Sequence, residues 1–84
     1  MVLEKTHKLV LHNDDVNSYQ YVIACLIRYC KHDPIQAEQC AIIVHNNESC
    51  DITSGCYAEM EHIKDELQEL GLKVSMDSLE SHLY

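Results

Sequence analysis

The chain has 84 residues, with 14 acidic against 6 basic side chains and a formal net charge of −8. A chain of this length folds as one domain that buries only a little over ~60% of its unfolded surface, which favours a surface groove over a deep enzyme cleft. The few lysines and arginines are scattered along the sequence, so nucleic acid and anionic membranes are excluded as expected partners.

The cysteines form an odd set without a Cys-x-x-Cys motif, and three of them lie inside helical apolar patterns. Free cysteine in such positions behaves as a small buried hydrophobe. No apolar run approaches the roughly 18 residues of a membrane span, and the first residues do not resemble a signal peptide. We therefore expect a soluble, cytoplasmic protein. The five cysteines are Cys25, Cys30, Cys40, Cys50 and Cys56.

In chain order, the first half predicts one strand followed by two helices. Residues 6–11 alternate as a strand, and residues 13–18 form a polar turn that ends in helix-capping residues. An amphipathic helix is predicted from about Tyr19 to Lys31. Asp33 as N-cap with Pro34 at the first helical position starts a second helix, which should end near residues 46–47.

The second half predicts a strand, a helix and a closing strand. Residues 48–55 contain β-branched side chains and end in Ser-Gly, which is typical of a short strand. Apolar residues from Met60 to Leu70 recur at helical spacing before Gly71, and residues 72–77 alternate as a strand. The order β-α-α-β-α-β predicts an α+β two-layer sandwich, with a small three-stranded antiparallel sheet packed on three helices.

We expect three segments: a short N-terminal extension at residues 1–6, the folded domain at residues 7–77, and a C-terminal tail at residues 78–84. The tail lacks periodicity. Its apolar side chains at Leu79, Leu83 and Tyr84 leave open whether it docks on the sheet.

Polar residues follow the first strand at the point where it ends. Asn13, Asp14 and Asp15 come directly after the apolar pattern of residues 8–11, and His45 ends the apolar pattern of the second helix. Without context, Asn-Asp-Asp after a strand is more often turn and capping chemistry than a binding site. If the fold brings His45 to the same place, the gathered acceptors suit a cationic ligand.

These residues, with the predicted element order, resemble the ClpS family of adaptor proteins for Clp-type AAA+ proteases. The resemblance spans about residues 7–77 and depends on Leu11-His12-Asn13-Asp14-Asp15, Val22-Ile23, Val44-His45, Ala58-Glu59 and Lys64. It implies a non-enzymatic protein without cofactor or metal. It also implies that the chain recognises substrate proteins by an N-terminal degron residue (Phe, Tyr, Trp or Leu) and delivers them to a Clp unfoldase.

The resemblance assigns each site residue a role. The free α-amino group would be bound by Asn13, Asp14 and His45. The side chain of the recognised residue would enter a pocket, and helix three would dock on the N-terminal domain of the unfoldase through Glu59 and Lys64. We expect a monomer with one ligand groove. The implied pocket residues are Asn17, Tyr19, Val22, Ala41, Val44 and Leu72.

The sequence departs from the family pattern at three places. Asn17-Ser18-Tyr19 stands where many relatives have Thr-Pro-Met, and Ala41 stands where many have a second Met. We hypothesise that Tyr19 and Ala41 alter the discrimination between aromatic, Leu and β-branched first residues. Glu48 also replaces a glycine that is common after the second helix.

Three other functions are compatible with parts of this sequence. A zinc site is disfavoured because Cys40-x4-His45 and Cys56-x5-His62 lack paired short-spaced ligands. An enzyme that uses His45 with Asp14 lacks a nucleophile motif, a phosphate loop or a cofactor fingerprint. The third is a generic protein-interaction domain, since a ribosomal stalk domain shares the same element order and fold alone does not separate the two.

Overall fold

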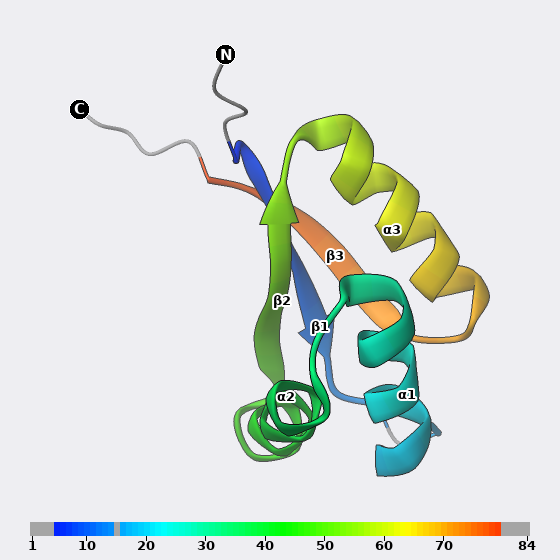
Figure 1. Cartoon of the computed structure of the whole chain (residues 1–84). Helices are drawn as coiled ribbons and strands as arrows, with labels where there is room; N and C mark the ends of the chain where they lie inside the picture. Colours follow the sequence, from blue (N-terminus) through cyan, green and yellow to red (C-terminus); the bar gives the residue numbers. More distant parts are fainter. Residues whose placement is uncertain (1–4, 15, 80–84) are drawn as a thin grey trace.

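The computed structural model describes residues 5–14 and 16–79. It confirms the predicted element order and the α+β two-layer architecture (Figure 1). The elements are β1 (His7–His12), α1 (Tyr19–Cys30), α2 (Pro34–Asn47), β2 (Ser49–Gly55), α3 (Tyr57–Glu69) and β3 (Lys73–Ser78).

The sheet is antiparallel and has the order β2-β1-β3, so the first strand lies in the centre. The pairing of β1 with β2 shifts between Leu9 and Val10, because Leu9 lies opposite Thr53 and Val10 opposite Asp51. In Figure 1 the described ends of the chain lie together at one end of the sheet, while α1 and α2 gather at the other. Asn13, Asp14 and Asn17, which lie between β1 and α1, are therefore placed beside α2.

Side-chain caps explain why α1 and α2 begin where they do. The Ser18 hydroxyl accepts the backbone N–H of Tyr21 at 3.2 Å, and the Asp33 carboxylate accepts that of Gln36 at 2.7 Å. Each cap satisfies a backbone donor that has no partner inside its helix. Since both helices start at fixed residues, the faces that they turn toward the sheet are fixed as well.

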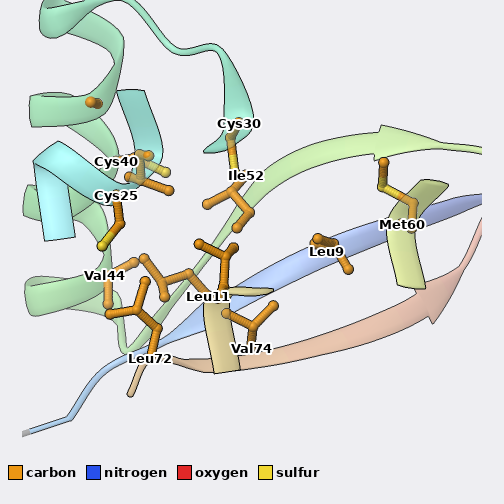
Figure 2. Packing of buried hydrophobic residues seen from close by; sticks show 13 residues of the cluster. Leu9, Leu11, Cys25, Cys30, Cys40, Val44, Ile52, Met60, Leu72 and Val74 are labelled. Carbon is orange, nitrogen blue, oxygen red and sulfur yellow. The ribbon is translucent and has the colours of Figure 1, made fainter. Parts of the chain in front are cut away.

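The core lies between the sheet and the three helices (Figure 2). Leu9 and Leu11 alternate along β1 and point into it, whereas Val10 between them is not part of the cluster. Ala37, Cys40 and Val44 supply the buried stripe of α2. The most deeply buried large side chains are Leu9, Leu11, Leu26, Met60 and Leu67.

The ends of the elements differ from the predicted ends by a few residues. The first strand begins at His7 rather than Thr6, and β3 continues through Ser78, the first residue of the predicted tail. Beyond the sheet, the Leu79 N–H donates to the Thr6 carbonyl oxygen at 2.9 Å. The boundaries of the extension and the tail stay predictions, and residues 80–84, with Leu83 and Tyr84, lie outside the described residues.

Candidate functional site

A cavity of about 330 Å³ opens where the end of β1, the start of α1 and the last turns of α2 meet. Eight of the nine residues predicted to bind the α-amino group or the side chain line it, and Leu11 and His12 line it as well. The lining residues are Leu11, His12, Asn13, Asp14, Asn17, Tyr19, Val22, Ala41, Val44 and His45.

The apolar wall of this cavity consists of Val22, Ala41 and Val44, together with Leu11. Ala41 and Val44 are three residues apart on α2, so they occupy one helix face. Val44 and Leu11 also belong to the core cluster, whereas Ala41 is 4% exposed without belonging to it. Ala41 therefore faces the cavity and leaves room where a longer side chain would fill it.

Asp14 organises the turn at the edge of the cavity. One carboxylate oxygen accepts the backbone N–H groups of Val16 and Asn17, each at 2.8 Å, and the other accepts the Asn17 side-chain amide at 3.0 Å. Partial burial acts to raise the pKa of Asp14, but these bonds and the charge of Lys73 outweigh it, so the pKa lies below its ordinary value of 3.8. The carboxylate is charged at neutral pH, and the described residues occupy three of its roughly four lone-pair positions.

Asn17 connects this turn to a distant part of the chain. Its side-chain nitrogen donates to Asp14 and also to the backbone carbonyl of Gly71 at 3.0 Å. Gly71 has a φ of +92°, a backbone conformation that side chains disfavour, and it separates α3 from β3. The Asn17 amide thus holds the edge of the cavity against the α3–β3 connection.

Asn13 is positioned through its backbone. Its N–H donates to the carbonyl oxygen of Glu48 at 2.9 Å, and Glu48 is the left-handed residue, with a φ of +77°, that ends α2. The Glu48 N–H in turn donates to the carbonyl oxygen of Val44 at 2.8 Å. Glu48 therefore joins the end of β1 to the end of the helix that carries His45.

The side-chain amide of Asn13 and the ring nitrogens of His45 have no hydrogen-bond partner among the described residues. The His45 ring instead meets the Tyr19 ring edge to face, with the centroids 5.5 Å apart and the planes at 86°. Tyr19 is 42% exposed. Two polar groups without a partner among the described residues thus line a cavity that also has apolar lining residues, with an aromatic ring beside them.

Leu72 is the one predicted pocket residue that does not line the cavity. It is 4% exposed and belongs to the core cluster. In Figure 2 it lies with Val44 and Leu11 at one end of that core. Because those two residues do line the cavity, Leu72 supports the wall from behind, and its direct contact with a ligand stays a prediction.

The two predicted docking residues lie apart from the cavity, on α3. Glu59 is exposed in the first turn of α3, where a Cβ on Gly55 would come within 2.6 Å of its carboxylate. Lys64 lies one to two turns further, with its ammonium nitrogen 3.9 Å from Asp65. A side chain at residue 55 would therefore displace the Glu59 carboxylate from its present position.

The sequence reasoning did not assign His12 and Leu11 to the cavity. The His12 ring hydrogen-bonds the Ser75 hydroxyl at 2.7 Å, which ties the end of β1 to β3. Their position directly before Asn13 was the available signal, because residues at a strand end share the environment of the turn that follows.

Metal and membrane chemistry find no support in the described part of the chain. Within residues 5–14 and 16–79, no group of three His, Cys, Asp or Glu side chains is arranged to hold a metal ion. Over the same residues, no helix has the length and apolar character needed to cross a membrane.

The structure is a small α+β domain with a cavity at the end of its central strand, and the comparisons identify its family. The sequence model of one protein family, described as ATP-dependent Clp protease adaptor protein ClpS, matches residues 3–75 of the 84. The chain belongs to the ClpS family. No curated protein sequence matches it significantly.

A solved structure has the same fold: Agrobacterium tumefaciens ClpS2 bound to L-phenylalaninamide. It superposes with a TM-score of 0.83 over 88% of this chain and 96% of that one. The identity is 19%, so this likeness bears on the fold alone.

Proposed function

We propose that this protein binds the free α-amino group and the bulky apolar side chain of N-terminal degron residues, and delivers the substrate to a Clp AAA+ unfoldase. One observation carries the proposal: the Asn13 amide and the His45 ring, which have no hydrogen-bond partner among the described residues, line the same cavity as the apolar Leu11, Val22, Ala41 and Val44. That arrangement matches a ligand with a cationic end and an apolar side chain on the same atom. The family to which the chain belongs consists of protease adaptors.

The polar edge would recognise the ammonium group. An α-ammonium has three N–H donors and a positive charge, so it needs acceptors that converge from several directions. The Asn13 side-chain oxygen and one His45 nitrogen are available, and the Asp14 carboxylate adds negative charge. Each hydrogen bond to a charged group is worth about 1.5–3 kcal/mol. An internal peptide nitrogen has one donor and no charge, and would be rejected.

The apolar wall would hold the side chain. Burying a Phe or Leu side chain against Val22, Ala41 and Val44 contributes roughly 1.5–3 kcal/mol. Together with the ammonium contacts, and less the entropy lost when a peptide end docks, this corresponds to an affinity of about micromolar or tighter. The A. tumefaciens ClpS2 structure contains L-phenylalaninamide, a molecule with one amino group and one phenyl ring.

Two positions would set the preference among first residues. The small Ala41 leaves space at the wall, and the Tyr19 ring lies against His45 beside the opening. We expect this pair to shift discrimination between aromatic, Leu and β-branched residues. A ranking of Phe, Leu and Ile peptides that is the same for an Ala41→Met variant would contradict this expectation.

Delivery would use α3. Glu59 and Lys64 are the positions proposed to contact the N-terminal domain of the unfoldase, and they leave the cavity free for cargo. We further propose that the protein acts as a monomer in the cytoplasm and has no enzymatic activity of its own.

The test is fluorescence-anisotropy binding of a labelled peptide that begins with Phe, compared with its N-acetylated twin. We expect tight binding of the free peptide, and loss of binding for the acetylated peptide and for the Asn13→Ala and His45→Ala proteins. If the free and acetylated peptides bind alike, the domain is instead an interaction module without N-terminal specificity.

A further inference from the structure

Two cysteines from different elements meet beside the cavity. Cys40 lies in the middle of α2 and Cys50 is the second residue of β2, yet their sulfur atoms are 2.7 Å apart. Both sulfurs are also within hydrogen-bonding range of the Asp51 carbonyl oxygen, at 3.9 Å from Cys40 and 3.4 Å from Cys50. The sulfurs of a disulfide are about 2.05 Å apart, so bonding would require a shift of well under an ångström.

The two thiols differ in access. Cys40 is 4% exposed within the core cluster, whereas Cys50 is half-buried and packs against that cluster from outside. Burial, followed by the contact with Cys50, raises the pKa of Cys40 well above the ordinary thiol value. Since the thiolate is the reactive form, Cys40 is a poor first target for an oxidant and Cys50 is the accessible one.

We propose that Cys40 and Cys50 form an intramolecular disulfide when the protein meets a hydroperoxide, which makes this pair a site of reversible oxidation. The Cys50 sulfur attacks the peroxide, the O–O bond breaks, and Cys50 becomes a sulfenic acid while an alcohol or water leaves. The Cys40 sulfur then attacks the Cys50 sulfur, the S–O bond breaks, and water leaves with the Cys40 proton. Two thiols and one hydroperoxide thus give one disulfide, one alcohol (or water) and one water.

The position of the pair gives the bond a structural consequence. Cys40 directly precedes Ala41, and the same helix carries Val44 and His45 of the cavity. A bond to Cys50 would fasten this helix covalently to β2 across the connection at Glu48. Cross-linking two elements that already pack together restricts the unfolded chain more than the folded one.

The other cysteines provide internal controls. Cys56 is exposed at the N-terminal cap of α3, so it is available to an oxidant and to alkylating reagents. Cys25 and Cys30 are buried in the core, and burial raises the pKa of Cys30 to about 11. If solvent exposure alone decided which cysteine is oxidised, Cys56 would react first. If the proximity of a second thiol decides, Cys40 and Cys50 form the disulfide.

The experiment exposes the full reduced chain to increasing hydrogen peroxide, denatures it in N-ethylmaleimide, and maps it by mass spectrometry. Cleavage after Glu48 separates Cys40 from Cys50, so their peptides stay joined only through a disulfide. We expect the intact mass to fall by two hydrogen atoms before alkylation, and the number of alkylated thiols to fall from five to three. The joined peptides should separate in reductant.

Variants complete the test. Cys56→Ser should form the same cross-link at the same peroxide concentration, whereas Cys40→Ala and Cys50→Ala should form none. The proposal is overturned if the wild-type chain yields no joined peptides, if the link requires Cys56, or if the only disulfides join two copies of the chain. The mapping on the wild-type chain does not depend on whether any variant folds.

Discussion

The apolar wall and the polar edge of the cavity are built differently. Val44 and Leu11 in the wall belong to the core, so folding alone accounts for their positions. At the edge, the Asn13 amide and the His45 ring have no hydrogen-bond partner among the described residues. Substitutions in the wall should therefore affect stability or pocket shape, and substitutions of these edge residues should affect ligand binding more than stability.

Leu72→Ala should have the largest effect, and the effect should be on folding. Leu72 is 4% exposed behind the wall, and removing a buried Leu side chain costs about 2–5 kcal/mol of unfolding free energy. Chemical denaturation measures the loss. The matched control is Leu79→Ala, at a Leu that is 39% exposed, where a much smaller loss is expected. Equal losses at both sites would place Leu72 outside the core.

Ala41→Met tests whether the Ala41 side chain faces an open cavity that can hold a larger side chain. Extra methylenes in a filled core cost about 1–3 kcal/mol, but Ala41 faces the cavity, so the unfolding free energy should change by less than about 1 kcal/mol. The added side chain should instead weaken binding of a Trp-initiated peptide by about tenfold or more, which corresponds to 1.4 kcal/mol. A destabilised variant with unchanged binding would show that Ala41 packs in the core.

Glu48→Gly should stabilise the junction between wall and edge. Glu48 has a φ of +77°, and the left-handed conformation costs a side-chain-bearing residue roughly 1–2 kcal/mol that glycine does not lose. After the greater flexibility of glycine in the unfolded chain is subtracted, we expect a gain of about 1 kcal/mol by chemical denaturation. Lys31→Gly is the matched variant at the end of α1, where φ is +60°. A loss of stability at Glu48 would mean that its side chain has a structural role.

The smallest expected effect is on the stability of the protein at acidic pH, through Asp14. Hydrogen bonds hold the folded pKa of Asp14 below 3.8, so ionised Asp14 stabilises the fold above that pH, and the contribution is lost as the pH falls through the lower, folded pKa. The unfolding free energy, measured from neutral pH down past 3.8, should fall less steeply at the acid end in Asp14→Asn than in the wild-type chain. Identical slopes would exclude this contribution.

The sequence was sufficient for the element order, because the caps at Ser18 and Asp33 and the apolar spacings are local signals. It also brought together residues 13, 14 and 45 through the family resemblance. The resemblance also assigned Leu72 to the pocket. The structure shows this side chain 4% exposed in the core cluster, a depth that a sequence pattern does not give, and its contact with a ligand stays a prediction.

The contact between Cys40 and Cys50 was equally out of reach. It depends on how α2 packs on β2, and the sequence pattern shows each cysteine only as a small apolar residue. The Asp14 carboxylate accepts hydrogen bonds from the backbone N–H groups of Val16 and Asn17. The composition of residues 13–18 predicted a turn, but it did not predict these hydrogen bonds.

The most direct measurement is a binding cycle: free and N-acetylated Phe peptides against the wild-type chain, Asn13→Ala and Ala41→Met. We expect acetylation to weaken wild-type binding by at least about 100-fold, since it removes the charge and two or more charge-assisted hydrogen bonds. The penalty should shrink by about tenfold in Asn13→Ala and persist in Ala41→Met. An acetylation penalty that is equal in wild type and Asn13→Ala would contradict the assignment of the polar edge to the ammonium group.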